Sequence, residues 1–249
     1  MKLTRANLLV FVLLVGAARL LAQDSGESKV TADFGYASRY VFRGVERAGS
    51  SAQASVEYAA HGFRGSVWTN QPLRSEQDGE IDLTTAYAHQ VSEKLNIELA
   101  LTAYYPTSAG AGATERSIEA GITATWTPIS GFTPSVSLQH DFQLESNSAQ
   151  AALACSVALT KLGAFLELSA FAGWSDARNA RPDEGGPRVG DGYGYFGGEA
   201  HIPYRMGAHT TVIAGIHATT TVGQGRTLAV PGRFARSNLW LTLGVSVDF

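Results

Sequence analysis

Three histidines near the end of the chain are the residues whose chemistry would be easiest to use. His201, His209 and His217 carry imidazole nitrogens, which bind Zn²⁺ and other transition metals. His209 and His217 lie on one expected strand, about 26 Å apart at the usual rise per residue, so they cannot share an ion. His201 approaches His209 only across the short turn near Tyr204, and two histidines without a third ligand are a weak zinc signal. We therefore expect solvated strand or turn positions, and predict no metal ligand and no cofactor.

A second group of residues could perform hydrolysis. A serine hydrolase needs a serine beside a histidine that an acid or amide orients. His140 precedes Asp141, and Ser135 and Ser137 lie on the same expected strand. Because side chains alternate between the two faces of a strand, His140 points away from both serines. Neither a G-x-S-x-G elbow nor an H-x-S pairing occurs, so we predict no catalytic residue and keep a lipid hydrolase as an alternative.

The C-terminal segment shows what kind of element positions these residues. In residues 239–249 every second side chain is apolar, and the side chains between them are mostly small or polar. A strand with this alternation has one uniformly apolar face, and its length suits a tilted strand that crosses a bilayer. The chain ends on Phe249, as do the C-terminal strands of outer-membrane barrels, where the final Phe is part of the assembly signal. The pattern therefore favours a lipid-facing strand over an ordinary sandwich strand.

The N-terminal residues predict export from the cytoplasm. Lys2 and Arg5 precede an apolar run over residues 8–18, and Ala22 offers a small residue at a cleavage site. We expect a signal peptide over residues 1–22, a short N-terminal segment over 23–29 and a barrel domain over 30–249. The apolar run is too short to span a membrane as a helix, so a mature chain that enters a bilayer must do so as a closed barrel.

Charge and cysteine content narrow the function further. The chain has a formal net charge of −3, which becomes −6 when residues 1–22, with three basic and no acidic side chains, are removed. An acidic chain argues against nucleic acid as a partner. The single Cys155 cannot form an internal disulfide, and its apolar phase indicates a small hydrophobic side chain.

Alternation recurs along the whole chain and predicts an all-β fold, a transmembrane antiparallel β-barrel of about twelve strands. An even number of strands places both termini on one side of the membrane. The expected strands cover residues 30–42, 52–58, 63–67, 81–87, 95–105, 118–126, 132–142, 151–159, 162–174, 196–202, 208–216 and 239–249.

The connections alternate in length, which indicates short periplasmic turns and longer outer loops. The connections of a soluble sandwich are not sorted in this way. The expected short turns are 60–62, 92–94, 128–131, 160–161 and 204–206, and the expected long loops are 44–50, 71–79, 106–115, 144–148, 175–191 and 220–236, of which 144–148 is only marginally long.

Aromatic residues at the strand ends predict two interfacial belts, as in membrane barrels. The expected outer belt contains Tyr40, Phe42, Tyr105, Phe142 and Trp174, and the expected periplasmic belt contains Trp126, Phe132 and Phe249.

The polar phase of the strands predicts the residues that line the pore. Charges that faced lipid near the midplane would cost a few kcal/mol each, so these side chains should point inward. Acidic residues outnumber arginines among them, which predicts a lumen that favours cations or polar neutral solutes. A lumen closed by its own side chains remains the alternative. The predicted pore-lining residues are Asp33, Arg39, Glu57, Arg64, Asp82, Glu98, Glu119, Asp141, Glu167, Glu199 and Asp248.

Residues 38–45, which read SRYVFRGV, resemble the S-x-Y-x-F-R-G motif of the TorF-like porin family. Residues 80–87 and 104–121 resemble two further landmarks of that family, although Thr84 and Thr85 replace its usual aromatic-small pair. The resemblance implies an outer-membrane barrel with a transport role and no catalytic residues. The matched motif positions are Tyr40, Phe42, Arg43 and Gly44.

The same motif has a simple structural interpretation. We expect Phe42 to anchor the outer interface, Arg43 to meet lipid headgroups or the lumen mouth, and Gly44 to let the loop turn. Contact between Arg43 and a substrate is a weaker alternative.

These observations predict a porin-like channel in the outer membrane of a Gram-negative bacterium. It would let small polar solutes diffuse passively and would favour cations. Its expected partners are outer-membrane lipid, the barrel-assembly machinery through Phe249, and the solutes themselves. Two alternatives stay open: an outer-membrane lipid hydrolase, and a binding or adhesion protein that uses loops 175–191 and 220–236 on a closed barrel.

Overall fold

The computed structural model describes residues 28–74, 77, 79–107, 116–161, 163–176, 192–222 and 237–249. The predicted signal peptide and most of the two longest predicted loops lie outside these residues. Within them, no helix has the length and apolar character needed to span a membrane.

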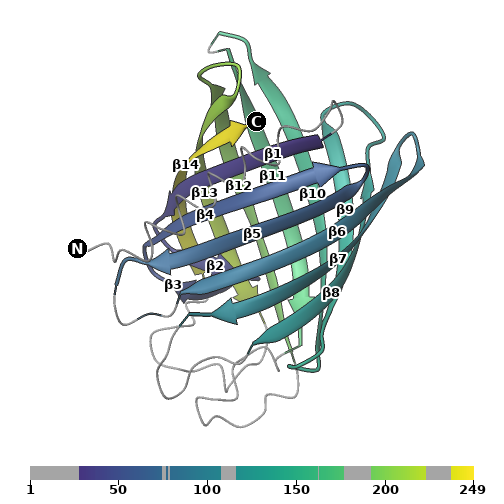
Figure 1. Cartoon of the computed structure of the whole chain (residues 1–249), viewed down its shortest axis with the longest axis vertical. Coiled ribbons are helices and arrows are strands. Elements are labelled where there is room, and N and C mark those ends of the chain that lie inside the picture. Colours follow the sequence, from purple (N-terminus) through teal and green to yellow (C-terminus); the bar gives the residue numbers. More distant parts are fainter. Residues whose placement is uncertain are drawn as a thin grey trace.

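Twelve antiparallel strands of the described chain close into one barrel, which confirms the predicted fold class (Figure 1). Each strand pairs with the next barrel strand in the chain, and β1 closes the ring by pairing with β14. The barrel strands are β1 (Ser28–Ala37), β4 (Ser51–Ala60), β5 (Phe63–Pro72), β6 (Glu80–Ser92), β7 (Leu95–Pro106), β8 (Ser117–Trp126), β9 (Phe132–Asp141), β10 (Ser146–Leu159), β11 (Ala164–Ser175), β12 (Tyr193–Arg205), β13 (Thr210–Val222) and β14 (Ser237–Asp248).

The closing seam uses the residue at the end of the chain. In the pairing of β1 with β14, Phe34 lies opposite Val245. The backbone N–H of Phe249 donates to the carbonyl oxygen of Val30 at 2.9 Å and extends the ladder by one residue. Closure removes the free sheet edge, so the backbone groups of the wall are paired within the wall.

The outer face of the wall is apolar and exposed. Leu239, Leu241 and Leu243 of β14 are 61%, 56% and 56% exposed, whereas residues of the polar phase are partly buried inside the barrel. This is the reverse of a water-soluble domain, which buries such side chains. Trp126, Phe132 and Phe249 are exposed at one end of the wall and Phe142 and Trp174 at the other, in agreement with two aromatic belts.

Short turns gather at one end of the barrel, where the C-terminus also lies (Figure 1). They cover 61–62, 93–94, 127–131, 160–163 and 206–209, so the predicted turn at 204–206 begins too early. At the other end, the prediction of a long loop at 144–148 is wrong, because only residues 142–145 join β9 to β10. Asp141 makes this tight connection feasible, since its Oδ1 accepts hydrogen bonds from the backbone N–H groups of Gln143 and Leu144 at 3.0 and 2.8 Å.

The first predicted strand is also too long. β1 ends at Ala37, and residues predicted as the strand end and the 44–50 loop form a separate hairpin of β2 (Tyr40–Phe42) and β3 (Val45–Ala48). Arg43 and Gly44 form its two-residue turn with φ values of 48° and 80°. Positive φ at both central residues is what a type I′ hairpin turn needs, and glycine adopts it without a steric cost. Gly44 therefore has the turning role expected from the sequence.

The apolar outer wall yields a first prediction. Ile122 and Thr123 are adjacent in the middle of β8, with Ile122 on the outer face and Thr123 opposite Glu98 on the inner face. In lipid vesicles, Ile122→Arg should lower the free energy of unfolding by about 2–4 kcal/mol, the cost of an arginine near the bilayer midplane. Thr123→Arg should cost far less, because the new charge meets a carboxylate. Denaturant unfolding followed by tryptophan fluorescence measures both, and equal losses would contradict the assignment of faces.

Candidate functional site

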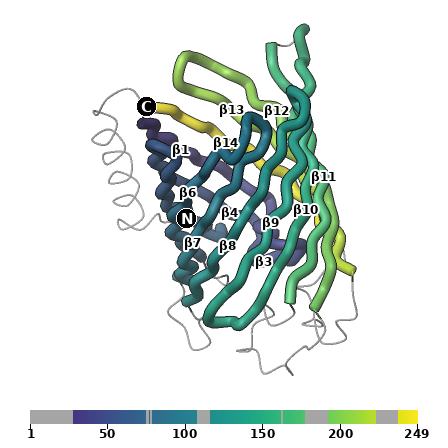
Figure 2. Tube along the Cα trace, turned by 90° about the vertical axis from the view of Figure 1, so that its right-hand side faces the viewer, coloured from purple at the N-terminus to yellow at the C-terminus, as the bar shows by residue number. Residues whose placement is uncertain are grey.

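The β2–β3 hairpin lies inside the barrel (Figures 1 and 2). It contacts opposite parts of the wall. On one side, the Tyr40 hydroxyl donates to Glu80 Oε1 of β6 at 2.9 Å. On the other side, the Gly44 carbonyl oxygen accepts a hydrogen bond from Asn238 Nδ2 of β14 at 3.1 Å, and this contact is buried. Val45 packs there with Tyr193 and Tyr195 of β12. All these wall residues lie near strand ends on the side away from the short turns, so the hairpin narrows that mouth of the barrel.

A buried ion pair fastens the hairpin to a third part of the wall. Arg43 Nη1 and Nη2 donate to the two carboxylate oxygens of Glu119 on β8, both at 2.8 Å, and the side chains are only 12% and 10% exposed. The Tyr104 hydroxyl of β7 donates to Glu119 Oε1 at 3.1 Å. Two parallel bonds from a planar guanidinium fix both distance and orientation. Removal of one partner of such a pair typically costs about 3–5 kcal/mol, because a buried charge is left uncompensated.

The aromatic motif residues face inward, so the predicted positions of Tyr40 and Phe42 in the outer belt are wrong. The Tyr40 ring packs against Trp68 of β5 with centroids 5.3 Å apart. The guanidinium of Arg43 lies 4.6 Å from the centroid of the Phe42 ring. The centroids of the Phe42 and Tyr104 rings are 6.3 Å apart. Strand alternation fails as a guide here because the chain leaves the wall at Ser38, whose N–H and hydroxyl both bond the backbone of β14. Arg43 contacts Glu119 rather than lipid headgroups.

Burial and neighbouring charges together shift the pKa values of Tyr40 and Arg43 upward. Burial, reinforced by the carboxylates of Glu80 and Asp82, raises the pKa of Tyr40 well above its ordinary value. The hydroxyl therefore keeps its proton and donates to Glu80. Burial disfavours the charged form of Arg43, but the hydrogen bonds and negative charge of Glu119 leave its pKa above the ordinary value.

Opposite charges face each other at this level of the lumen. Glu80 and Asp82 of β6 and Glu119 of β8 form the acidic wall, and the hairpin and its leading segment carry the arginines Arg39, Arg43 and Arg47. Asp82 Oδ1 is buried and has no hydrogen-bond partner in the described part of the chain. A solute that passes here would experience an electric field directed across the lumen, since both signs of charge are fixed in a confined space.

Below the hairpin, three predicted pore-lining residues meet on one wall. Arg64 of β5 lies between Glu57 of β4, at 3.3 Å, and Glu98 of β7, at 2.7 Å. Asp33 of β1 accepts a hydrogen bond from Ser55 of β4 at 2.8 Å. Glu57, Arg64 and Glu98 therefore form one charged cluster, contributed by β4, β5 and β7.

The remaining predicted pore residues are placed differently. Asp248 forms a salt bridge with Lys29 at 2.9 Å near the short turns. Asp141 accepts a hydrogen bond from the backbone of the 142–145 connection. Arg39 pairs with Glu46 within the hairpin segment at 3.5 Å. Glu167 and Glu199 lie on β11 and β12, beside a cavity in the opposite wall.

Two of the three histidines lie together, with the Nε2 atoms of His201 and His217 3.4 Å apart. His201 therefore lies beside His217 and not beside His209, and the prediction of a solvated position is wrong for His217, which is buried. The register explains this: Arg205 pairs with Thr211, so His201 falls opposite Gly215 and diagonally beside His217. His140 makes a hydrogen bond of 2.9 Å to Asn147 and packs on Phe142, on the outer face rather than beside a serine.

Sequence reasoning missed the inward hairpin and the partners that hold it, Tyr104 and Asn238. The Arg43-Gly44 dipeptide between Phe42 and Val45 was the available signal, since glycine at the second turn position is typical of two-residue hairpins. Nothing in the sequence alone pairs Arg43 with Glu119, because the two are 76 residues apart.

No family model and no curated protein matches the chain, so the TorF-like resemblance stays a prediction. Solved structures do match. The chain is similar to the NanC porin (TM-score 0.56, 10% identity, 88% of this chain and 98% of that one) and to the COG4313 outer membrane channel from Pseudomonas putida F1 (0.54, 8%, 91% and 96%). It is also similar to LpxR from Salmonella typhimurium (0.53, 10%, 88% and 100%). At these identities the likeness shows the fold, a transmembrane antiparallel barrel, and does not select a function.

The fit of Gly44 against the wall yields a second prediction. A Cβ at this position would lie 2.8 Å from Tyr195 Cβ and 2.9 Å from Thr221 Cγ2, at a φ of 80°. Gly44→Ala should therefore displace the hairpin and increase single-channel conductance, with the barrel still folded.

Gly163→Ala is the matched control. It carries the same kind of backbone cost, about 1–2 kcal/mol, at a φ of 60° in a short turn with nothing within 4 Å of the new Cβ. Its conductance should equal that of the wild type. An unchanged conductance in Gly44→Ala would contradict the role of the hairpin as the narrow point.

Proposed function

We propose that this chain is a channel of the bacterial outer membrane through which small polar solutes diffuse passively, with cations favoured. The observation that carries the proposal is the charged inner wall. It continues from the hairpin at one mouth, through the Glu57–Arg64–Glu98 cluster, to Asp248 at the other end. Charged and polar side chains on the inner face are typical of the water-filled lumen of a porin.

The location in an outer membrane has its own support. The outer wall is apolar, the barrel is closed, and the solved structures it resembles include porins and an outer membrane channel. Lipid is then the partner of the outer wall. Recognition of Phe249 by the barrel-assembly machinery remains part of the proposal.

The hairpin supports a narrowed channel. A barrel of about eight strands is filled by its own side chains, whereas sixteen to eighteen strands leave a wide aqueous channel. Twelve strands lie between these cases, and one inserted hairpin reduces the opening further at a single level. We infer that solutes pass beside the hairpin, through the part of the lumen that it leaves open, which limits them to small molecules.

The pairing of the carboxylates supports a preference for cations. Several of them contact neutral donors instead of Arg or Lys: Asp33 contacts Ser55, Glu80 contacts Tyr40, and Glu199 contacts Ser169. Arg64 is shared between two carboxylates, which leaves that cluster negative. The fixed charge of the wall is therefore negative on balance, and such a lumen concentrates cations.

A hydrolytic function has less support. The likeness to LpxR, which is not named as a porin, means that the fold does not decide the question. The sequence contains one adjacent His-Asp pair, His140 and Asp141. His140 is hydrogen-bonded to Asn147 on the outer face, and Asp141 accepts hydrogen bonds from a backbone turn, so neither residue orients the other.

Conductance in planar bilayers tests the proposed function. Purified protein should give discrete current steps, and the reversal potential in a salt gradient should show a preference for cations. Silence from a folded, heat-modifiable barrel would support a closed barrel with a binding role, and release of fatty acid from phospholipid or lipid A that is lost in His140→Ala would support the hydrolase.

The acidic wall should determine the selectivity. The double variant Glu80→Gln/Asp82→Asn removes the two neighbouring carboxyl groups opposite the hairpin, and the negative charge that they share, and should lower the ratio of cation to anion permeability. Glu93→Gln changes the same type of side chain in the β6–β7 turn, outside the lumen, and should leave the ratio unchanged. Equal ratios in all three proteins would contradict the electrostatic basis of the proposal.

A further inference from the structure

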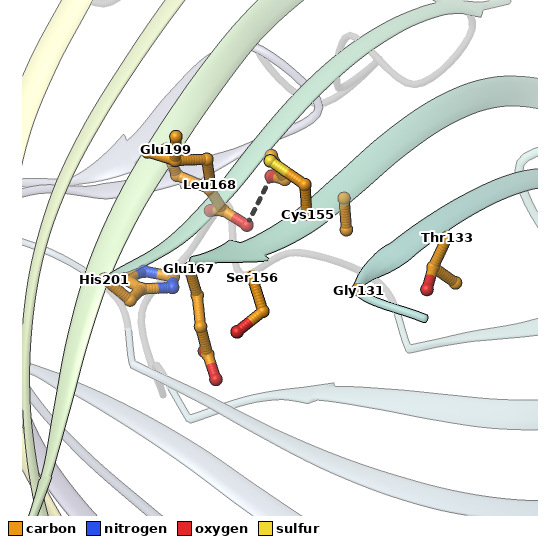
Figure 3. A pocket seen from close by; sticks show the side chains of 10 residues that line it. Gly131, Thr133, Cys155, Ser156, Glu167, Leu168, Glu199 and His201 are labelled. Atoms are coloured by element: carbon orange, nitrogen blue, oxygen red, sulfur yellow. Dashed lines mark hydrogen bonds between the residues drawn. The ribbon is translucent and has the colours of Figure 1, made fainter. Parts of the chain in front are cut away.

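A cluster of His201, His217 and Glu199 lies on the inner face of β12 and β13, away from the hairpin. One ligand atom from each residue lies within 4.8 Å of the other two. His201 and Glu199 of the cluster border a cavity of about 290 Å³, as does Glu167 (Figure 3). Ser169 also lines this cavity. The proposed channel makes no use of these residues beyond their charge.

Glu199 fixes the hydrogen position on His217. Its Oε2 lies 3.0 Å from His217 Nδ1, and a carboxylate can only accept, so Nδ1 carries the proton. In the neutral ring, Nε2 then has no proton and presents a lone pair. The Ser169 hydroxyl donates to the other carboxylate oxygen at 3.0 Å and holds Glu199 in place. A carboxylate that accepts a hydrogen bond from one ring nitrogen is the usual second layer of a histidine whose other nitrogen binds a metal.

The lone pair of His217 faces the ring of His201. The two Nε2 atoms are 3.4 Å apart, which is long for a hydrogen bond between them. Two ligands of a tetrahedral ion at the usual Zn–N distance are separated by about 3.4 Å, so the rings already have the spacing that a shared ion requires.

The surroundings hold both rings in place. Trp240 of β14 stacks on His217 with centroids 4.9 Å apart and planes inclined by 7°. Gly215 lies opposite His201, and a Cβ there would collide with the Thr242 hydroxyl and the His201 ring. The Thr242 hydroxyl lies 2.9 Å from His217 Nε2, so an ion would replace one hydrogen bond to that nitrogen.

We propose that His201 Nε2 and His217 Nε2 bind one divalent transition-metal ion, with Glu199 as the positioning carboxylate. Water from the cavity fills the remaining ligand positions. Imidazole nitrogens select Zn²⁺, Cu²⁺ or Ni²⁺ over Ca²⁺ and Mg²⁺, which prefer oxygen. The carboxylates of Glu199 and Glu167 beside the cavity attract a cation to this part of the wall.

Isothermal titration of untagged, folded protein in detergent with Zn²⁺ tests the site without any need for conduction. We expect one saturable Zn²⁺ site per chain and no comparable binding of Ca²⁺ or Mg²⁺. His201→Gln and His217→Gln should each weaken Zn²⁺ binding by more than tenfold, and Glu199→Gln should weaken it by about 10–100-fold, as loss of a supporting carboxylate does. As a control, His209→Gln makes the same substitution in the turn that joins β12 to β13, and it should leave Zn²⁺ binding unchanged.

Two further measurements keep the inference falsifiable if a histidine variant folds poorly. Co²⁺ bound to the wild-type chain should give visible absorption bands, which Zn²⁺ should displace. Thr242→Val removes the hydroxyl that competes for His217 Nε2, so it should bind Zn²⁺ at least as tightly as the wild type. Absence of saturable Zn²⁺ binding, binding that survives in both histidine variants, or loss of binding in His209→Gln would each overturn the site. A silent bilayer would overturn only the proposed channel.

Discussion

The structure depends on one constraint: in hydrocarbon, every backbone N–H and carbonyl group of the wall must be paired within the protein. The chain meets it by joining its two ends, since β1 pairs with both β4 and β14, and Phe249 extends the seam to Val30. An open sheet of the same strands would leave two edges unpaired in lipid. Because the ring is closed, each strand has one face for lipid and one for the lumen. The alternation in the sequence follows from that geometry.

The same closure leaves an interior that the wall alone does not fill, and the first connection uses it. The β2–β3 hairpin occupies the mouth because it brings partners for its own polar groups: Arg43 for Glu119, Tyr40 for Glu80, and the Gly44 carbonyl for Asn238. Each contact reaches a different part of the wall. A hairpin held by only one of them could swing aside, whereas three separated anchors fix both its position and its orientation.

Alternation along the chain was enough to predict the twelve-stranded barrel and the two faces of its wall. These features depend on a period of two, which a single sequence displays. The errors occur where a different cause takes over. Tyr40 and Phe42 continued the alternation of β1, but the chain had already left the wall at Ser38. The pairing of His201 depends on register, and register depends on the exact turn that joins β12 to β13. A turn that runs from 206 to 209 brings His217, not His209, beside His201.

The energetics of the Arg43–Glu119 pair explain why the hairpin can be both firmly held and sensitive to small changes. Taking two charges out of water is costly, and their attraction repays the cost only while both partners and their hydrogen bonds are in place. Glu119 also accepts a hydrogen bond from the Tyr104 hydroxyl, so the wall itself holds the carboxylate in position for Arg43. Net stability of the inserted state is thus a small difference between two large quantities, and the close contact of Gly44 with Tyr195 and Thr221 adds to the favourable side. A perturbation that separates the two charges by even a short distance loses the compensation but keeps much of the desolvation cost. The width of the mouth therefore depends on the buried contacts of the hairpin, and on the Arg43–Glu119 pair in particular, more than on the ladders of the barrel wall.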